Sequence, residues 1–171
     1  MGGKEKDFVK DAFKSNFIAP LGPHLDAFEE NVSTYLGQNL HCVGLSSGTA
    51  ALHLALIISG VKRDDEVWVS SMTFAGGAFP IKYLGANPRF FDLNPKTWCI
   101  DVDIVRNELE KAAIENRLPK AIIPTDLYGQ SVELNELEFL TKKYGIPLIV
   151  DSAESLGAEY LDGRKAGSGG D

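Results

Sequence analysis

The stretch Pro147-Leu148-Ile149-Val150-Asp151-Ser152-Ala153-Glu154 decides the fold, because apolar residues run directly into a carboxylate and a second carboxylate follows three residues later. A short, uninterrupted apolar run is typical of a strand buried on both faces of a parallel sheet. Asp151 would then lie at the end of that strand, on the edge where open α/β sheets bind their ligands. Such a carboxylate either faces solvent or supplies charge to a ligand, and this stretch alone leaves both open.

Strand and helix patterns alternate along the chain on the N-terminal side of this stretch. Strands are expected at residues 40–45, 67–69, 89–92, 121–123 and 148–151, and helices at residues 50–59, 74–84, 101–117 and 132–144. Two more helices, at residues 7–15 and 23–36, precede the first strand and are joined by a loop rich in turn residues. The alternation predicts an α/β fold with right-handed crossovers and a mostly parallel sheet flanked by helices.

Composition excludes several classes of function. The 171 residues carry a net charge of −7, which argues against nucleic acid or an anionic membrane as the main partner. Cys42 and Cys99 lie far apart and are expected to be buried free thiols, and the three histidines lack metal-ligand spacing, so no metal site is predicted. We find neither a membrane-spanning apolar run nor a signal peptide, and expect a cytoplasmic protein.

Ser47, Gly48 and Thr49 form the first candidate binding site. They turn the expected strand at 40–45 into the helix that begins near Ala50. Free N–H groups at a helix start bind anions, a glycine allows close approach, and the two hydroxyls can add donors. Helix capping by a hydroxyl is the alternative explanation. A P-loop lysine and a Rossmann glycine motif are both missing, which argues against those nucleotide sites.

Phe74 follows the expected strand at 67–69 and could stack on a planar ligand or lie in the core. The anion-binding turn at Ser47–Thr49, Phe74 and Asp151 would then lie at the carboxyl ends of three strands. Pyridoxal 5′-phosphate requires all three features: an anion site, a ring partner, and a carboxylate that keeps its pyridine nitrogen protonated.

Over nearly its whole length the chain resembles the DegT/DnrJ/EryC1/StrS sugar aminotransferases, which are pyridoxal phosphate enzymes of fold type I. The resemblance rests on Ser47-Gly48-Thr49-Ala50-Ala51-Leu52-His53-Leu54-Ala55-Leu56, Ser71-Met72-Thr73-Phe74, Asp151-Ser152-Ala153-Glu154 and Gly163-Arg164-Lys165-Ala166-Gly167. Residues 13–22 and Leu127-Tyr128-Gly129 look most like the UDP-4-keto-sugar aminotransferases that make bacillosamine precursors. The resemblance implies an aspartate-aminotransferase-like large domain.

It also implies residue roles. Ser47, Gly48 and Thr49 would contact the cofactor phosphate, Phe74 its ring and Asp151 its pyridine nitrogen, while Glu154 would lie against the ring. Residues Asn16, Phe17, Ile18 and Ala19, with Gly48, would line the nucleotide-sugar site, although 16–19 could equally be a simple connecting loop. The amino donor would be glutamate, the acceptor a 4-keto or, as second choice, a 3-keto nucleotide sugar, and the protein a homodimer.

The resemblance further predicts a division of the chain. Residues 1–36 would form a helical segment with the substrate loop, and residues 37–171 part of the cofactor-binding large domain. The Schiff-base lysine of the family is not found here, Lys165 is no substitute, and the C-terminal small domain is absent. We therefore expect an N-terminal piece of a longer enzyme that is inactive alone. A pseudo-enzyme domain without turnover, or a sugar dehydratase of the same group, are the alternatives.

Overall fold

A computed structural model describes residues 2–37 and 40–171 of the chain. The chain divides into two compact units, Met1–Gly44 and Leu45–Asp171, which we describe separately. The boundary at 44/45 lies eight residues beyond the predicted one at 36/37. None of the helices in the described ranges has the length and apolar character needed to cross a membrane.

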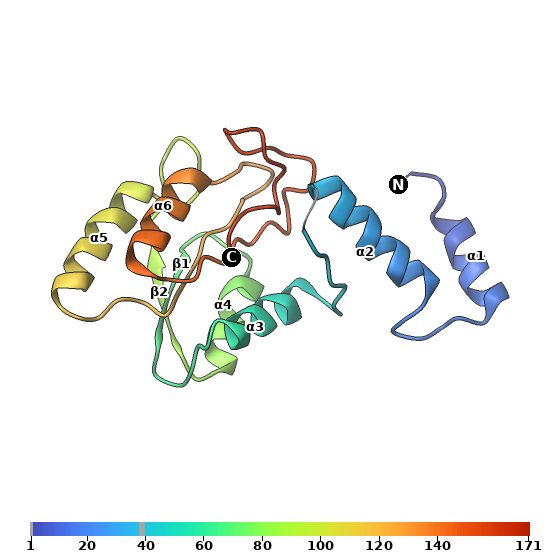
Figure 1. The fold of residues 1–171 in the computed structure, drawn as a ribbon, viewed down its shortest axis with the longest axis horizontal. Helices are drawn as coiled ribbons and strands as arrows, with labels where there is room; N and C mark the ends of the chain where they lie inside the picture. Colours follow the sequence, from blue (N-terminus) through green and yellow to red (C-terminus); the bar gives the residue numbers. More distant parts are fainter. Residues whose placement is uncertain (1, 38–39) are drawn as a thin grey trace. The chain divides into compact units, whose positions relative to one another are not determined.

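The second unit is a parallel sheet between two layers of helices (Figure 1). Its elements are α3 (Gly48–Ile58), β1 (Glu66–Ser70), α4 (Ala75–Tyr83), β2 (Asn87–Phe91), α5 (Val102–Ile114), β3 (Ala121–Ile123) and α6 (Leu134–Tyr144). Within the described residues the strand order is β2-β1-β3, and both pairings are parallel. The predicted α/β alternation is confirmed from residue 48 to residue 144.

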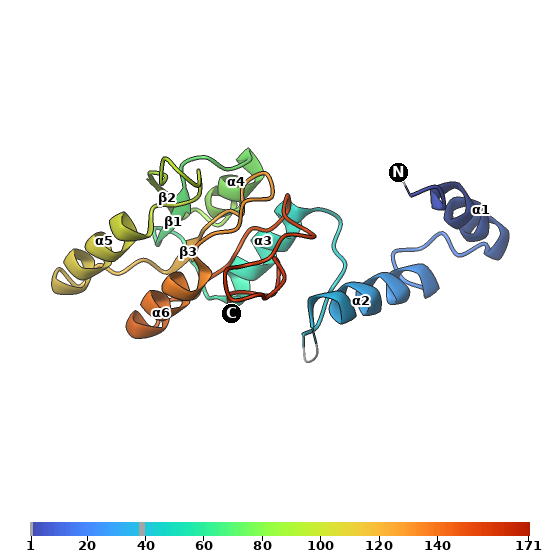
Figure 2. The same ribbon diagram turned by 90° about the horizontal axis from the view of Figure 1, so that it is seen from above.

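β1 and β3 are buried, as their continuous apolar sequences predict, whereas Phe90 of the edge strand β2 is exposed. In β1, Trp68 points into one hydrophobic cluster, whereas Val67 and Val69 point into the other. The Trp68 cluster contains apolar residues of α5 and α6, and the other cluster contains those of α3 and α4. Figure 2 shows the two helix pairs from above, with the strands between them. Side chains alternate across a strand, so one strand serves both cores.

The stretch that we expected as a strand at 148–151 lies beside β3 and runs parallel to it. The two segments meet at bridges between Ile122 and Leu148 and between Thr125 and Asp151. Four backbone hydrogen bonds join them, and the expected bond from residue 124 to residue 149 is missing because Pro124 has no N–H. The proline therefore divides the pairing into two bridges. The predicted direction and neighbour are confirmed, but a continuous strand is not formed.

The expected strand at 40–45 is wrong. Residues 40–45 have no regular secondary structure, and the side chains of Leu40, Val43 and Leu45 are exposed. An alternating apolar pattern forms a strand only where a neighbouring strand supplies hydrogen bonds and a face to bury. In the described part of the chain, this segment has no such neighbour.

The first unit contains α1 (Glu5–Ser15) and α2 (Pro23–Leu36), which confirms both N-terminal helices. Asn16 ends α1 in the left-handed conformation, with φ of 56°. The apolar faces of these helices are not buried: Phe28 and Tyr35 of α2, for example, are exposed.

Asp101 caps α5, which carries four buried residues against the sheet. Its Oδ1 accepts hydrogen bonds from the N–H groups of Asp103 and Ile104, at 2.9 and 3.1 Å. We predict that Asp101→Ala lowers the free energy of unfolding by about 1 kcal/mol, because two N–H groups lose their acceptor. Urea denaturation measures this loss.

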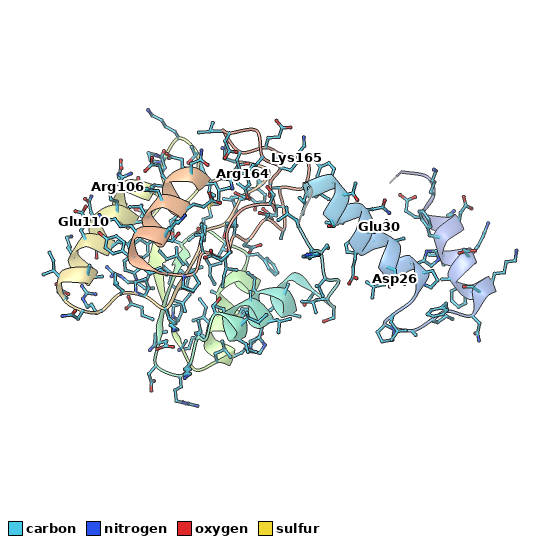
Figure 3. The ribbon with its side chains drawn as sticks, in the orientation of Figure 1. Asp26, Glu30, Arg106, Glu110, Arg164 and Lys165 are labelled. Carbon is cyan, nitrogen blue, oxygen red and sulfur yellow. The ribbon has the colours of Figure 1, made fainter. Side chains whose placement is uncertain are left out.

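Glu110→Ala is the matched control, because Glu110 lies on the exposed side of the same helix (Figure 3). Its effect should stay within about 0.5 kcal/mol. Equal destabilisation by both variants would contradict the role of Asp101 as the cap.

Candidate active site

The turn before α3 leaves open space beside the helix start. Ser47 is the N-cap, and its Oγ accepts a hydrogen bond from the Ala50 N–H at 3.1 Å. A Cβ built on Gly48 would meet no atom within 4 Å. The capping explanation is therefore confirmed for Ser47, but its hydroxyl proton can still be donated. The N–H groups of this first turn face space that an oxyanion can enter.

Thr49 and Phe74 meet at Gly76, in the first turn of α4. A Cβ built on Gly76 would lie 2.6 Å from Thr49 Oγ1 and 3.1 Å from Phe74 Cδ1. Only a glycine at position 76 lets Thr49 and the ring of Phe74 approach one another this closely. Phe74 is 78% exposed as a residue, which rules out the alternative that it belongs to the core.

Asp151 lies at the carboxyl end of the segment next to β3, and β1, which leads to Phe74, is on the other side of β3. Two interstrand spacings, or about 10 Å, therefore separate the segments that carry the two residues. The Asp151 side chain is partly buried, and Oδ1 accepts a hydrogen bond from the Ala153 N–H at 3.2 Å. Burial raises the pKa of Asp151, the Ala153 N–H lowers it, and Glu154 and Asp126 raise it further. A cationic partner beside Asp151 would stabilise its ionised carboxylate.

Glu154 contacts the loop that follows β3. Its Oε2 accepts a hydrogen bond from the Tyr128 N–H at 2.9 Å. Tyr128 has a φ of 50°, a conformation that is uncommon for a residue with a side chain. Glu154 thus stabilises a strained turn at the same edge of the sheet as Asp151.

Thr125 contributes a polar atom without a partner. Its N–H donates to Ser70 Oγ at 3.1 Å, but its buried Oγ1 has no hydrogen-bond partner among the described residues. Because Thr125 is bridged in parallel to Asp151, the two side chains lie on the same face of the sheet. Buried hydroxyls normally find a partner, so an unpaired one at this edge of the sheet is unusual.

These features fit pyridoxal 5′-phosphate. The open helix start at Gly48 suits a phosphate, the exposed ring of Phe74 suits a planar heterocycle, and the partly buried Asp151 suits a protonated pyridine nitrogen. Among the described residues no cluster of histidine, cysteine and carboxylate side chains could hold a metal ion.

The remaining predicted residues, Asn16 to Ala19, belong to the first unit, whereas Gly48 belongs to the second. Asn16 ends α1, the ring of Phe17 packs on Gly22, and Ile18 is 66% exposed. Their pairing with Gly48 stays a prediction.

Asp126 was missed by the sequence reasoning. It is fully buried three residues beyond the end of β3, and its carboxylate accepts hydrogen bonds from Ser152 and Ser155 in the loop that follows Asp151. The signal that singled out Asp151, a carboxylate close behind a buried apolar strand, is present at residues 121–126 as well.

The Gly163–Gly167 motif is fixed by Arg164, labelled in Figure 3. The guanidinium binds both carboxylate oxygens of Glu138 at 2.8 and 2.9 Å and the Asn135 oxygen at 2.8 Å. These contacts attach the motif to α6, and the paired carboxylate has a lowered pKa. Lys165 forms an ion pair with Glu159, so this motif organises structure.

Comparison with known proteins shows which family this chain belongs to. The chain belongs to the DegT/DnrJ/EryC1/StrS aminotransferase family, whose pattern it matches over residues 1–171. Its large domain is of the aspartate-aminotransferase-like type, or fold type I, as expected.

Three similar proteins illustrate the relationship. A Bacillus subtilis (strain 168) protein named as a pyridoxal phosphate-dependent aminotransferase, EpsN, is 43% identical over 99% of this chain and 43% of its own length. The UDP-2-acetamido-2-deoxy-3-oxo-D-glucuronate aminotransferase of Pseudomonas aeruginosa is 36% identical over 84% of this chain and 38% of its own. The crystal structure of a DegT DnrJ EryC1 StrS aminotransferase from Brucella abortus superposes with a TM-score of 0.85 at 29% identity, covering 98% of this chain and 47% of that one. The chain thus spans less than half the length of each of these proteins.

The raised pKa of Asp151 predicts a pH-dependent stability. A carboxyl whose pKa is higher in the folded state binds its proton more tightly there, so the stability it confers falls as pH rises between the unfolded and folded pKa values. We predict that Asp151→Asn makes the cofactor-free chain more stable than the wild type at about pH 7, and that this gain shrinks towards about pH 4. Urea denaturation across this range measures the difference.

Asp162→Asn is the control of opposite sign, because hydrogen bonds from Arg164 lower the pKa of Asp162. At neutral pH, Asp162→Asn should have a lower free energy of unfolding than the wild type, and this difference should disappear in acid. A wild-type chain that is more stable than Asp151→Asn at neutral pH would contradict the assigned environment of Asp151.

Proposed function

We propose that this chain forms the cofactor-binding part of a nucleotide-sugar aminotransferase that uses pyridoxal 5′-phosphate. The observation that carries the proposal is the convergence of Thr49 and Phe74 at Gly76, on a sheet that presents a partly buried Asp151. Family membership supports it, and the names of similar proteins include both the cofactor and a nucleotide sugar.

In this proposal each residue has a distinct task. The N–H groups at Gly48 and Thr49, with the hydroxyls of Ser47 and Thr49, hold the phosphate. Phe74 covers one face of the ring and excludes water from it. Asp151 accepts a hydrogen bond from the protonated pyridine nitrogen, which keeps its proton. Glu154 borders the ring while it holds the Tyr128 turn.

When bound, the cofactor would supply the chemistry of amino-group transfer between two substrates, with its protonated ring as the electron-withdrawing group. Asp151 supports this chemistry because an ionised carboxylate beside the nitrogen favours the protonated ring. The partial burial of Asp151 strengthens the attraction between its carboxylate and the protonated nitrogen, because water screens charges less in a less polar environment.

We further propose glutamate as the amino donor and a 4-keto nucleotide sugar, of the UDP-linked kind, as the acceptor. Asn16, Phe17, Ile18 and Ala19 would contact the acceptor together with Gly48. We also propose a homodimer that works in the cytoplasm, where free thiols such as that of buried Cys99 stay reduced.

Pyridoxamine 5′-phosphate, the amino form of the cofactor, is the probe for this proposal, because it needs no lysine to bind. Titration followed by the absorbance of the probe and by isothermal calorimetry should give saturable 1:1 binding. Failure of the folded chain to bind the probe would refute the cofactor assignment. In the protein that carries the complete family sequence, transfer of ¹⁵N from glutamate to a UDP-4-keto sugar tests the substrates.

Gly48→Ala separates the phosphate site from the fold. The added methyl group meets nothing within 4 Å in the chain itself, so thermal unfolding should be almost unchanged. We predict at least about tenfold weaker binding of the probe, because the methyl group enters the space reserved for the phosphate. Ser59→Ala, at the opposite end of α3, is the control and should bind as the wild type. Wild-type affinity in Gly48→Ala would place the phosphate elsewhere.

A further inference from the structure

Asp126 is the most heavily hydrogen-bonded buried charge near the proposed site. It has no exposed surface and lies three residues beyond the end of β3. One carboxylate oxygen accepts a hydrogen bond from the Val132 N–H at 2.8 Å. The other accepts from Ser152 Oγ at 2.6 Å, from Tyr160 Oη at 2.9 Å and from Ser155 Oγ at 3.3 Å.

Asp126 and its neighbours form hydrogen bonds to the segment of Asp151 through both backbone and side-chain groups. The Asp126 N–H donates to the Asp151 carbonyl at 2.9 Å, and the Asp151 N–H donates to the Pro124 carbonyl at 2.9 Å. The carboxylate of Asp126 then binds Ser152, the next residue along the chain. The main chain and the side chain of Asp126 thus both restrain the backbone that carries the Asp151 carboxylate.

The donors to Asp126 are neutral, and no ion pair to its carboxylate is found in the part of the chain that the structure describes. Neutral donors stabilise a buried carboxylate without cancelling its charge. Asp151 therefore has a second carboxylate behind it, and Asp126 and Glu154 are the charged groups that raise its pKa, after burial. Such repulsion is costly unless a cation binds nearby.

We propose that Asp126 is a positioning residue: it aims the Asp151 carboxylate at the pyridine nitrogen of the cofactor and adds negative potential there. The inference rests on the proposed function for its ligand, but the coupling between the two aspartates belongs to the chain itself. Tyr160 and Ser152 are two of the four donors that hold the Asp126 carboxylate in place, and the pKa of Tyr160 is raised, chiefly by burial.

Two phosphorylated probes distinguish positioning from general structural support. Pyridoxamine 5′-phosphate carries a basic ring nitrogen, whereas benzyl phosphate has a ring and a phosphate but no such nitrogen. In Asp126→Asn we expect affinity for the first probe to fall about tenfold at about pH 8, with affinity for benzyl phosphate changed by less than about twofold. The bound ring should also lose its proton at a lower pH, as read from its absorbance.

Ser152→Ala is the second test variant if Asp126→Asn does not fold, because it removes the hydroxyl that binds the Asp126 carboxylate from the residue next to Asp151. We expect about threefold weaker binding of pyridoxamine 5′-phosphate and unchanged binding of benzyl phosphate. Ser131→Ala is the control: it removes another hydrogen bond of the same loops, to the Glu159 carbonyl at 3.0 Å, without contacting Asp126. That control should bind both probes as the wild type does.

A cofactor-free readout separates this inference from the proposed function. Carboxyl ¹³C NMR should show that the pKa of Asp151 moves down towards its ordinary value in Asp126→Asn, because a neighbouring negative charge is gone. If the wild type binds no pyridoxamine 5′-phosphate but this change occurs, the proposed function fails and the coupling stands. An unchanged Asp151 pKa, or equal losses for both probes in Ser152→Ala, overturns the inference.

Discussion

The parallel pairing of residues 148–151 with β3 is the constraint on which the rest of the structure depends. The pairing places the Asp151 carboxylate at the sheet edge, brings Thr125 onto the same face, and makes the Asp126 N–H a donor to the Asp151 carbonyl. Pro124 interrupts the hydrogen bonds in the middle of the pairing but not at its carboxyl end. The site therefore rests on the last bonds of the ladder, where residues leave the sheet towards a ligand.

A second constraint is the steric demand at Gly76. The turn before α3 and the ring of Phe74 come from separate segments of the chain. They approach one another because Gly76, the second residue of α4, has no side chain. Helix–helix packing between α3 and α4 is thus coupled to the spacing of the proposed phosphate and ring contacts. A larger residue there would move Thr49 or Phe74, so the packing of the unit and its binding geometry cannot vary independently.

Repulsion among the carboxylates at the site lowers the stability of the cofactor-free chain. Asp126, Asp151 and Glu154 place three carboxylates around one edge of the sheet, and the middle one is partly desolvated. Buried carboxylates of this kind usually indicate function, because they are retained despite their cost. Neutral hydroxyl and backbone donors satisfy Asp126 without removing its charge, and Arg164 is engaged elsewhere, with Glu138 and Asp162. The sheet edge therefore keeps a negative potential that a cationic ring can use.

The sequence by itself determined the order of helices and strands from residue 48 to residue 144, since apolar runs and periodic faces are local properties of the chain. It also marked Ser47–Thr49, Phe74 and Asp151, because turn residues, aromatics and carboxylates directly after apolar strands can be recognised without coordinates. It could not decide that residues 40–45 lack a strand partner, that Phe74 is exposed, or that Asp126 is buried under four donors. Those outcomes depend on which segments meet in space, and pairing, burial and charge coupling between distant residues arise only once the chain has folded.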